Sequence, residues 1–292
     1  MSTIRELVQE MLDKLWPELN DPLSNGQPNP LYLPAIIQKE GYDPYAIGSW
    51  TLGFIDVGTG NRNQICGPTG QIQQQNWIDS TSTPNPYVLI SSATLIGVSN
   101  IEASTATAVG SGYTILAKAD LSVLPTHPRS STVTVSSEIS ISGSFELHQW
   151  CCVTTDFVHC ASPAPPPDVQ VGTGSFAAVI PKSRADLWLE ITSLAPDVFQ
   201  LAVTSVSFVA STVAFSANIT SVPRSQQAHW NTVANQALNS GEATGAMIDH
   251  INDVMNQPNE RNKLGDTLTQ KIDAYLKENH KYPFDNPHEA IF

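Results

Sequence analysis

The chain has few charged residues, and most of them are acidic. Charged residues make up 14% of its 292 residues, and 27 acidic against 14 basic residues give a formal net charge of −13. An acidic chain repels phosphate backbones, so we expect no nucleic-acid partner. The same charge disfavours electrostatic docking on anionic lipid, so any transient membrane contact would have to be apolar.

The sequence also lacks a secretory signal and a long apolar run. It opens on an amphipathic segment that contains acids, not on a basic stub followed by an apolar stretch. No stretch approaches the 18 or so uncharged apolar residues of a transmembrane helix. We therefore expect a cytoplasmic protein, and release by lysis or by a non-classical route stays open.

Cysteine is scarce, with four residues in the whole chain. Because no secretory signal is present, we expect free thiols. Three of the cysteines form a short cluster with two histidines: His148, Cys151, Cys152, His159 and Cys160. Zinc needs four ligands that converge tetrahedrally, whereas adjacent side chains diverge on a strand. We predict no metal site and no cofactor.

Motifs of catalysis and nucleotide binding are missing as well. The glycine pairs at 58–60, 110–112 and 172–174 lack a Walker lysine and do not open helices, so tight turns explain them. The sequence has no G-x-S-x-G elbow and no H-E-x-x-H motif. We predict that the chain is not an enzyme.

What the sequence does have is an unusually long alternation of apolar and polar residues, from Thr132 to His148. A period of two indicates one β-strand with an apolar face and a wetted face. At about 3.3 Å per residue this strand would be roughly 50 Å long, whereas ordinary strands have about 5–6 residues. Such strands are typical of elongated sheets that wrap a helix, and of toxins that insert amphipathic hairpins into membranes.

Helical patterns stand at both ends of the chain. Apolar residues at helical spacing predict a helix over Ile4–Leu15, ended by Pro17. From Ser225 the period is helical again, with a first long helix to about Asn256, where Gly241 and Gly245 allow a bend, and a second helix after Pro258.

Strand patterns fill most of the region between these helices. Segments at 87–103, 113–124, 132–152, 174–180, 185–193 and 198–222 predict an antiparallel meander. The last segment reverses its apolar phase between Phe208 and Val213, which predicts a hairpin or a bulge. A sheet with one apolar face must bury that face against other elements, and the terminal helices of the same chain can cover it.

The prediction is a single elongated α+β domain over residues 1–292. It has an N-terminal helix at 1–19, a turn-rich segment at 20–86, an antiparallel sheet at 87–222, C-terminal helices at 225–279 and an irregular tail at 280–292.

The order of elements resembles the tubular lipid-binding (TULIP) superfamily, which includes takeout-like proteins and the P47-like and OrfX-like proteins of bacterial toxin clusters. The resemblance rests on the opening helix Ile4–Leu15, the segment Ala93–Ile101, the long strands and the long helix from Ser225. It implies a long, highly twisted antiparallel sheet rolled around a long C-terminal helix, with an apolar tunnel between them. It also implies binding or transport of lipid without catalysis.

Our first functional hypothesis is therefore the binding of a lipid or another hydrophobic molecule between sheet and helix. Met fills irregular apolar space adaptably, which suits such a wall. The residues that we predict to line the tunnel come from the long strand and the first C-terminal helix: Val133, Ile139, Ile141, Phe145, Leu147, Met247, Ile251 and Met255.

Two alternatives stay open. Residues 113–147 contain two alternating segments long enough to insert as a β-hairpin, which would make a pore-forming or toxin-complex protein. A structural or assembly protein would instead pair its long strands between chains. Partners would then be a toxin-cluster protein or a second copy of the chain.

Overall fold

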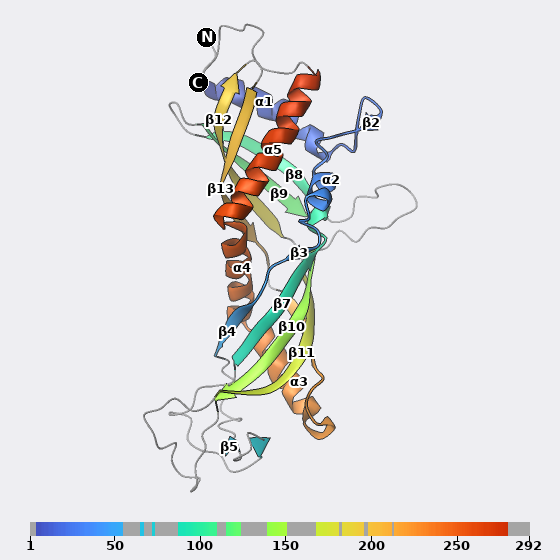
Figure 1. The fold of residues 1–292 in the computed structure, drawn as a ribbon, viewed down its shortest axis with the longest axis vertical. Coiled ribbons are helices and arrows are strands. Elements are labelled where there is room, and N and C mark those ends of the chain that lie inside the picture. The colour runs from blue at the N-terminus through green and yellow to red at the C-terminus, as the bar shows by residue number, and fades with distance from the viewer. Residues whose placement is uncertain are drawn as a thin grey trace.

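The computed structural model describes residues 4–54, 65–66, 72–73, 87–109, 115–123, 139–150, 168–180, 183–195, 198–211 and 213–279. The molecule is elongated and has the α+β architecture that the sequence predicts (Figure 1). The α-helices are α1 (Ile4–Leu15), α2 (Leu33–Lys39), α3 (Arg224–Leu238), α4 (Gly241–Met255) and α5 (Pro258–Asn279). Short 3-10 helices are η1 (Pro17–Asn20) and η2 (Val98–Asn100). Within the described residues, none of the helices is long and apolar enough to cross a membrane.

The strands are short near the N-terminus and long afterwards. The short ones are β1 (Leu23–Ser24), β2 (Gln27–Pro28), β3 (Tyr45–Ala46), β4 (Trp50–Phe54), β5 (Ile65–Cys66) and β6 (Ile72–Gln73). The longer ones are β7 (Tyr87–Ile96), β8 (Ile101–Val109), β9 (Ile115–Val123), β10 (Ile139–Trp150), β11 (Asp168–Ile180), β12 (Arg184–Ala195), β13 (Val198–Val209) and β14 (Ala214–Ile219).

The long strands form two sheets instead of the single predicted one. The six-stranded sheet has the order β14-β11-β10-β7-β3, with β4 also paired to β7, and the four-stranded sheet has the order β13-β12-β9-β8. Every pairing is antiparallel. The two sheets follow one another along the long axis of the molecule (Figure 1).

The chain passes between the sheets where the sequence predicts a continuous strand. The predicted strand at 87–103 is split at Gly97, whose φ of 88° suits glycine, and β7 and β8 belong to different sheets. The Asp43 carboxylate holds this corner, accepting hydrogen bonds from the Gly97 N–H and the Ser99 N–H, both at 2.9 Å.

The phase reversal before Val213 has the same origin. It is neither a hairpin nor a bulge, because β13 ends at Val209 in one sheet and β14 begins at Ala214 in the other. Each strand points its apolar residues at the core of its own sheet, so the phase changes at the crossing.

The alternation that dominates the sequence is confirmed over the described part of its range. In β10, Ile139, Ile141, Phe145 and Leu147 are buried, while the residues between them are at least partly exposed. Residues 132–138 lie outside the described part of the chain.

Strands β10 and β11 pair through two copies of the same tripeptide. Gly143-Ser144-Phe145 and Gly174-Ser175-Phe176 run antiparallel, so that Gly143 is opposite Phe176 and Phe145 is opposite Gly174. A methyl group added at Gly174 would lie 2.7 and 2.8 Å from atoms of the Phe145 ring. Each glycine therefore provides the space that the phenylalanine opposite it occupies.

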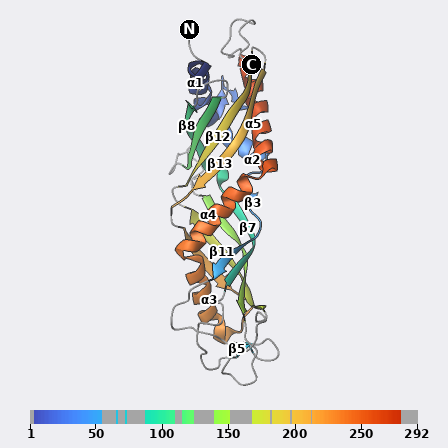
Figure 2. The same ribbon diagram turned by 90° about the vertical axis from the view of Figure 1, so that its left-hand side faces the viewer.

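The C-terminal helical region contains three helices, not the predicted two. The Ser240 side chain caps α4 by accepting a hydrogen bond from the Ala243 N–H at 3.1 Å, so Gly241 begins a new helix instead of bending a long one. Helices α3, α4 and α5 follow one another along the long axis in both views (Figures 1 and 2). Most residues of their predicted apolar stripes are buried, including Trp230, Met247 and Tyr275, and the others, such as Ile248 and Leu264, are partly buried.

Side-chain amides attach these helices to the exposed backbone of the sheet edges. β14 ends the six-stranded sheet, and three asparagines at four-residue spacing meet its alternate residues. Ile219 N–H donates to Asn231 at 2.6 Å, Asn235 exchanges two hydrogen bonds with Ala217, and Asn239 exchanges two with Phe215.

The same arrangement continues along β13, which ends the four-stranded sheet. The pairs are Asn252 with Phe208, Asn256 with Val206, Thr269 with Leu201, and Asp273 with Phe199. On the opposite edge, β8 is paired by Gln9 of α1 and by Asn20 of η1. We call these contacts the amide ladders, since most of them are made by side-chain amides; the Thr269 hydroxyl and the Asp273 carboxylate are the exceptions.

Candidate functional site

An apolar cavity of about 100 Å³ lies where the two sheets meet the helices. The sheets contribute residues of β7, β8, β10, β12 and β13, which are Leu95, Ile101, Ile139, Ala185, Leu187, Val206 and Phe208. The helical side is formed by Trp16, Leu19, Leu33, Ile37, Ile251, Met255, Leu264 and Leu268. Val98, Tyr42 and Tyr45 complete the wall. A water molecule needs about 10–15 Å³ on this measure, so the cavity is several waters in size.

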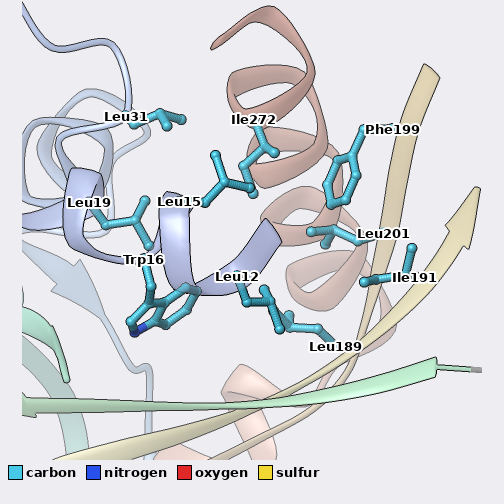
Figure 3. Close-up of a pocket in the computed structure, with 10 residues that line it drawn as sticks. All are labelled: Leu12, Leu15, Trp16, Leu19, Leu31, Leu189, Ile191, Phe199, Leu201 and Ile272. Atoms are coloured by element: carbon cyan, nitrogen blue, oxygen red, sulfur yellow. The ribbon is translucent and has the colours of Figure 1, made fainter. Parts of the chain in front are cut away.

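A second apolar cavity, of about 20 Å³, lies next to the first (Figure 3). It is bounded by α1, η1, α5 and strands β12 and β13. Trp16 and Leu19 line both cavities, so they form the partition between them. The sequence predicted one tunnel between sheet and helix, and the described residues form two adjoining cavities.

The surface of the larger cavity is apolar, although two tyrosines and one tryptophan are among its described lining residues. Burial, followed by the nearby Glu260 and Glu40 carboxylates, raises the pKa of Tyr42 to about 12. Burial and Glu260 also raise the pKa of Tyr45, whose hydroxyl donates a hydrogen bond to Glu260. Both phenols are therefore neutral near pH 7.

The segment that contributes the tyrosines is held by single side-chain contacts with α4 and α5. The Lys263 ammonium lies 4.5 Å from the centre of the Tyr42 ring and donates to the Glu40 carbonyl at 2.8 Å. His250 stacks on Trp50, with ring centres 4.8 Å apart, and its Nε2 lies 2.9 Å from the Ile47 carbonyl oxygen.

The predicted lining residues divide into three groups. Ile139, Ile251 and Met255 line the larger cavity. Ile141, Phe145, Leu147 and Met247 are almost fully buried in the common core and are not among the residues that line either cavity. Val133 lies outside the described residues.

Sequence reasoning missed the contribution of the turn-rich segment. Leu33, Ile37, Tyr42 and Tyr45 come from residues 20–86, where we predicted mainly turns. A signal was present, because Leu33 to Ile37 is an apolar run with Pro34 at the start of a helix, a position that proline favours.

The residues that the structure describes contain no group of three or more His, Cys, Asp or Glu side chains able to hold a metal. Of the cysteine–histidine cluster only His148 is described, and its Nε2 lies 2.9 Å from a Glu146 carboxylate oxygen. The other members of the cluster lie outside the described residues.

Comparisons with known proteins give weak structural matches and no match by sequence. No protein-family profile matches the chain. No curated protein matches it either. A solved structure of Takeout 1 from Epiphyas postvittana matches with a TM-score of 0.34 and 10% identity, over 92% of this chain and 89% of that one. Lipopolysaccharide binding protein matches with a TM-score of 0.27 and 9% identity, over 86% of this chain and 37% of that one.

Both TM-scores lie below 0.5. Because the sequence identities are also low, we infer the function of this chain from its own structure.

Proposed function

We propose that the chain binds a lipid or another hydrophobic molecule, without catalysis, in the cavity between the two sheets and helices α2, α4 and α5. The observation that supports this most directly is the composition of the wall. All the residues lining the larger cavity are apolar or aromatic. Burial of a ligand methylene gains about 0.8 kcal/mol, so an acyl chain would bind such a wall without a charged partner.

The position of the cavity supports the same proposal. It lies at the junction of sheets and helices, where small-molecule sites are commonly found. Two of its helical walls, α4 and α5, are attached to the edge of β13 by hydrogen bonds of side chains.

The side chains that line the cavity support the proposal of a binding role without catalysis. Among the described residues that line it there is no carboxylate, thiol, imidazole or amine. A general acid, general base or nucleophile would need a polar group within hydrogen-bond reach of the ligand, and the surface of this cavity is apolar.

Native mass spectrometry of the purified protein tests the proposal. We expect a co-purifying lipid or, after its removal, uptake of a labelled fatty acid, alcohol or ester in a one-to-one ratio. Hexanoate serves as the control, because its short chain offers little apolar surface to the wall. A protein that stays unliganded with every long-chain compound would contradict the proposal.

The membrane-inserting alternative depended on a hairpin formed by residues 113–147. In the structure β9 pairs with β8 and β12, whereas β10 pairs with β7 and β11. The two strands belong to different sheets. The predicted pairing is therefore wrong, and we do not propose a pore.

A further inference from the structure

The two apolar cavities lie end to end, because three elements line first one and then the other. On β12 the buried residues in chain order are Ala185 and Leu187 in the larger cavity, then Leu189 and Ile191 in the smaller one. The corresponding residues of the other two elements are Phe208, Val206, Leu201 and Phe199 on β13, and Leu264, Leu268 and Ile272 on α5. At about 3.3 Å per residue the β12 residues cover roughly 20 Å. The cavities therefore form one slot with a single interruption among the described residues.

Two side chains make this interruption. Among the described lining residues, Trp16 and Leu19 are common to both cavities. Figure 3 shows them on the side of the smaller cavity opposite Phe199 and Leu201. The surface of each cavity is apolar. An alkyl chain would therefore meet apolar groups on both sides of the partition.

The backbone that carries Leu19 is fixed by hydrogen bonds on both sides of this residue. The Asn29 side chain donates to the Glu18 carbonyl at 2.7 Å. The Asn20 side chain donates to the Ala103 carbonyl of β8 at 2.8 Å and accepts from the Ala103 N–H at 2.9 Å. A smaller side chain at position 19 would therefore open the partition without changing the path of the chain.

The length of a bound alkyl chain determines how much it gains from such a slot. Each methylene that a ligand buries against an apolar wall raises its affinity about fourfold. This gain ends where the chain meets closely packed side chains, because protein interiors resist overpacking. A chain in the larger cavity meets Trp16 and Leu19 before it reaches the apolar space behind them.

We propose that Leu19, with Trp16 beside it, sets the longest alkyl chain that the site accepts. The chain ends against this partition, and a shorter side chain at position 19 admits its end into the smaller cavity. This inference rests on the proposed function, because it names the residue that selects among ligands of the same cavity.

A series of 1-alkanols from octanol to hexadecanol tests this proposal, each measured by displacement of a fluorescent lipid. In the wild-type protein the affinity should rise about fourfold per methylene up to one chain length and then stay level. Leu19→Ala removes three carbon atoms, so this limit should move to chains about three methylenes longer, and chains beyond the wild-type limit should bind more than about tenfold more tightly. Leu19→Val removes one carbon atom and should move the limit by about one methylene.

Leu15→Ala is the matched control. Leu15 lines the smaller cavity and does not line the larger one, so it lies behind the partition. This variant deletes the same atoms as Leu19→Ala, and its limit should stay at the wild-type chain length.

The outcomes separate the two proposals. If no alkanol and no longer lipid binds the wild-type protein, the proposed function fails. If alkanols bind but the wild type shows no limit, or if the limit is the same in the wild type and both Leu19 variants, the function stands and the role of Leu19 is overturned. A shift in Leu15→Ala as large as that in Leu19→Ala also overturns it. Leu19→Val decides if Leu19→Ala does not fold, and the presence of a wild-type limit decides if neither folds.

Discussion

Asn235 of α3 and Ala217 of β14 exchange two hydrogen bonds. The Ala217 N–H donates to Asn235 Oδ1 at 2.9 Å, and Asn235 Nδ2 donates to the Ala217 carbonyl at 3.0 Å. The asparagine thus completes the backbone pattern of an edge strand as a neighbouring strand would. The ladder repeats because four helical residues rise about 6 Å, close to the rise of two residues in a strand.

Replacing one of these amides should destabilise the protein. We expect Asn235→Leu to lower the free energy of unfolding by about 2 kcal/mol, because two backbone groups of an edge strand lose their partners. Urea denaturation followed by circular dichroism measures the change. Asn262→Leu is the matched control, because Asn262 is exposed on α5, and it should change stability by less than about 0.5 kcal/mol. Equal effects of the two variants would show that the ladder contributes nothing specific.

The paired G-S-F tripeptides lead to a second prediction. Gly174→Ala should destabilise the protein by several kcal/mol, since the new methyl group would contact the Phe145 ring at 2.7 Å and also the Asn218 carbonyl oxygen. The thermal midpoint of unfolding measures this. Gly245→Ala serves as the opposite case, because a methyl group there meets nothing within 4 Å inside α4. That variant should gain about 0.5–1 kcal/mol.

A substitution that fills the cavity should weaken ligand binding and leave the free energy of unfolding nearly unchanged. Ala185 lines the larger cavity, whereas Ala178 is buried in the six-stranded sheet away from it. We expect Ala185→Leu to fold with little loss of stability and to bind a long-chain lipid at least tenfold more weakly. Ala178→Leu should cost about 1–3 kcal/mol, because it has no space to fill, and should bind lipid normally if folded. Lipid uptake by Ala185→Leu at the wild-type level would place the ligand elsewhere.

Stability should fall at alkaline pH. The pKa of Tyr42 is raised from 10.0 to about 12 in the folded protein, so the folded state holds the proton more tightly than the unfolded state does. This contribution is complete below pH 10 and is lost as the pH rises from 10 to 12. Tyr45 shifts in the same direction. Urea midpoints at pH 9 and pH 11 should differ less in Tyr42→Phe than in the wild type. An unchanged difference would exclude Tyr42 as a cause.

Much of the fold was predictable from the sequence because local patterns determine it. The stripes of α1 and α3 and the alternation of β10 are buried as the sequence predicted. The predictions that were wrong concerned the connections between elements. At Gly97 the chain crosses from one sheet to the other although the sequence reads as one strand. The crossing between Val209 and Ala214 appears in the sequence only as a reversal of the apolar phase, which a hairpin or a bulge would also explain.

The candidate site was less predictable than the fold. We predicted that Ile139, Ile251 and Met255 line a cavity because they lie on the apolar faces of a strand and a helix, and all three line the larger cavity. Phe145 and Met247 have the same pattern, but their side chains pack in the core, and periodicity alone does not distinguish a packed residue from one that borders a cavity. Trp16 and Tyr42 were missed because they belong to the end of a helix and to a turn, where no period exists.

The amide ladders also bear on self-association. Edge strands with free N–H and C=O groups can recruit strands from other molecules, and natural proteins protect such edges. Here the edges at β14, β13 and β8 are occupied by asparagine, glutamine and threonine side chains of the chain's own helices. A second copy would have to displace a helix before it could add a strand there. The side chains that hold the helices therefore also limit aggregation through these three edges.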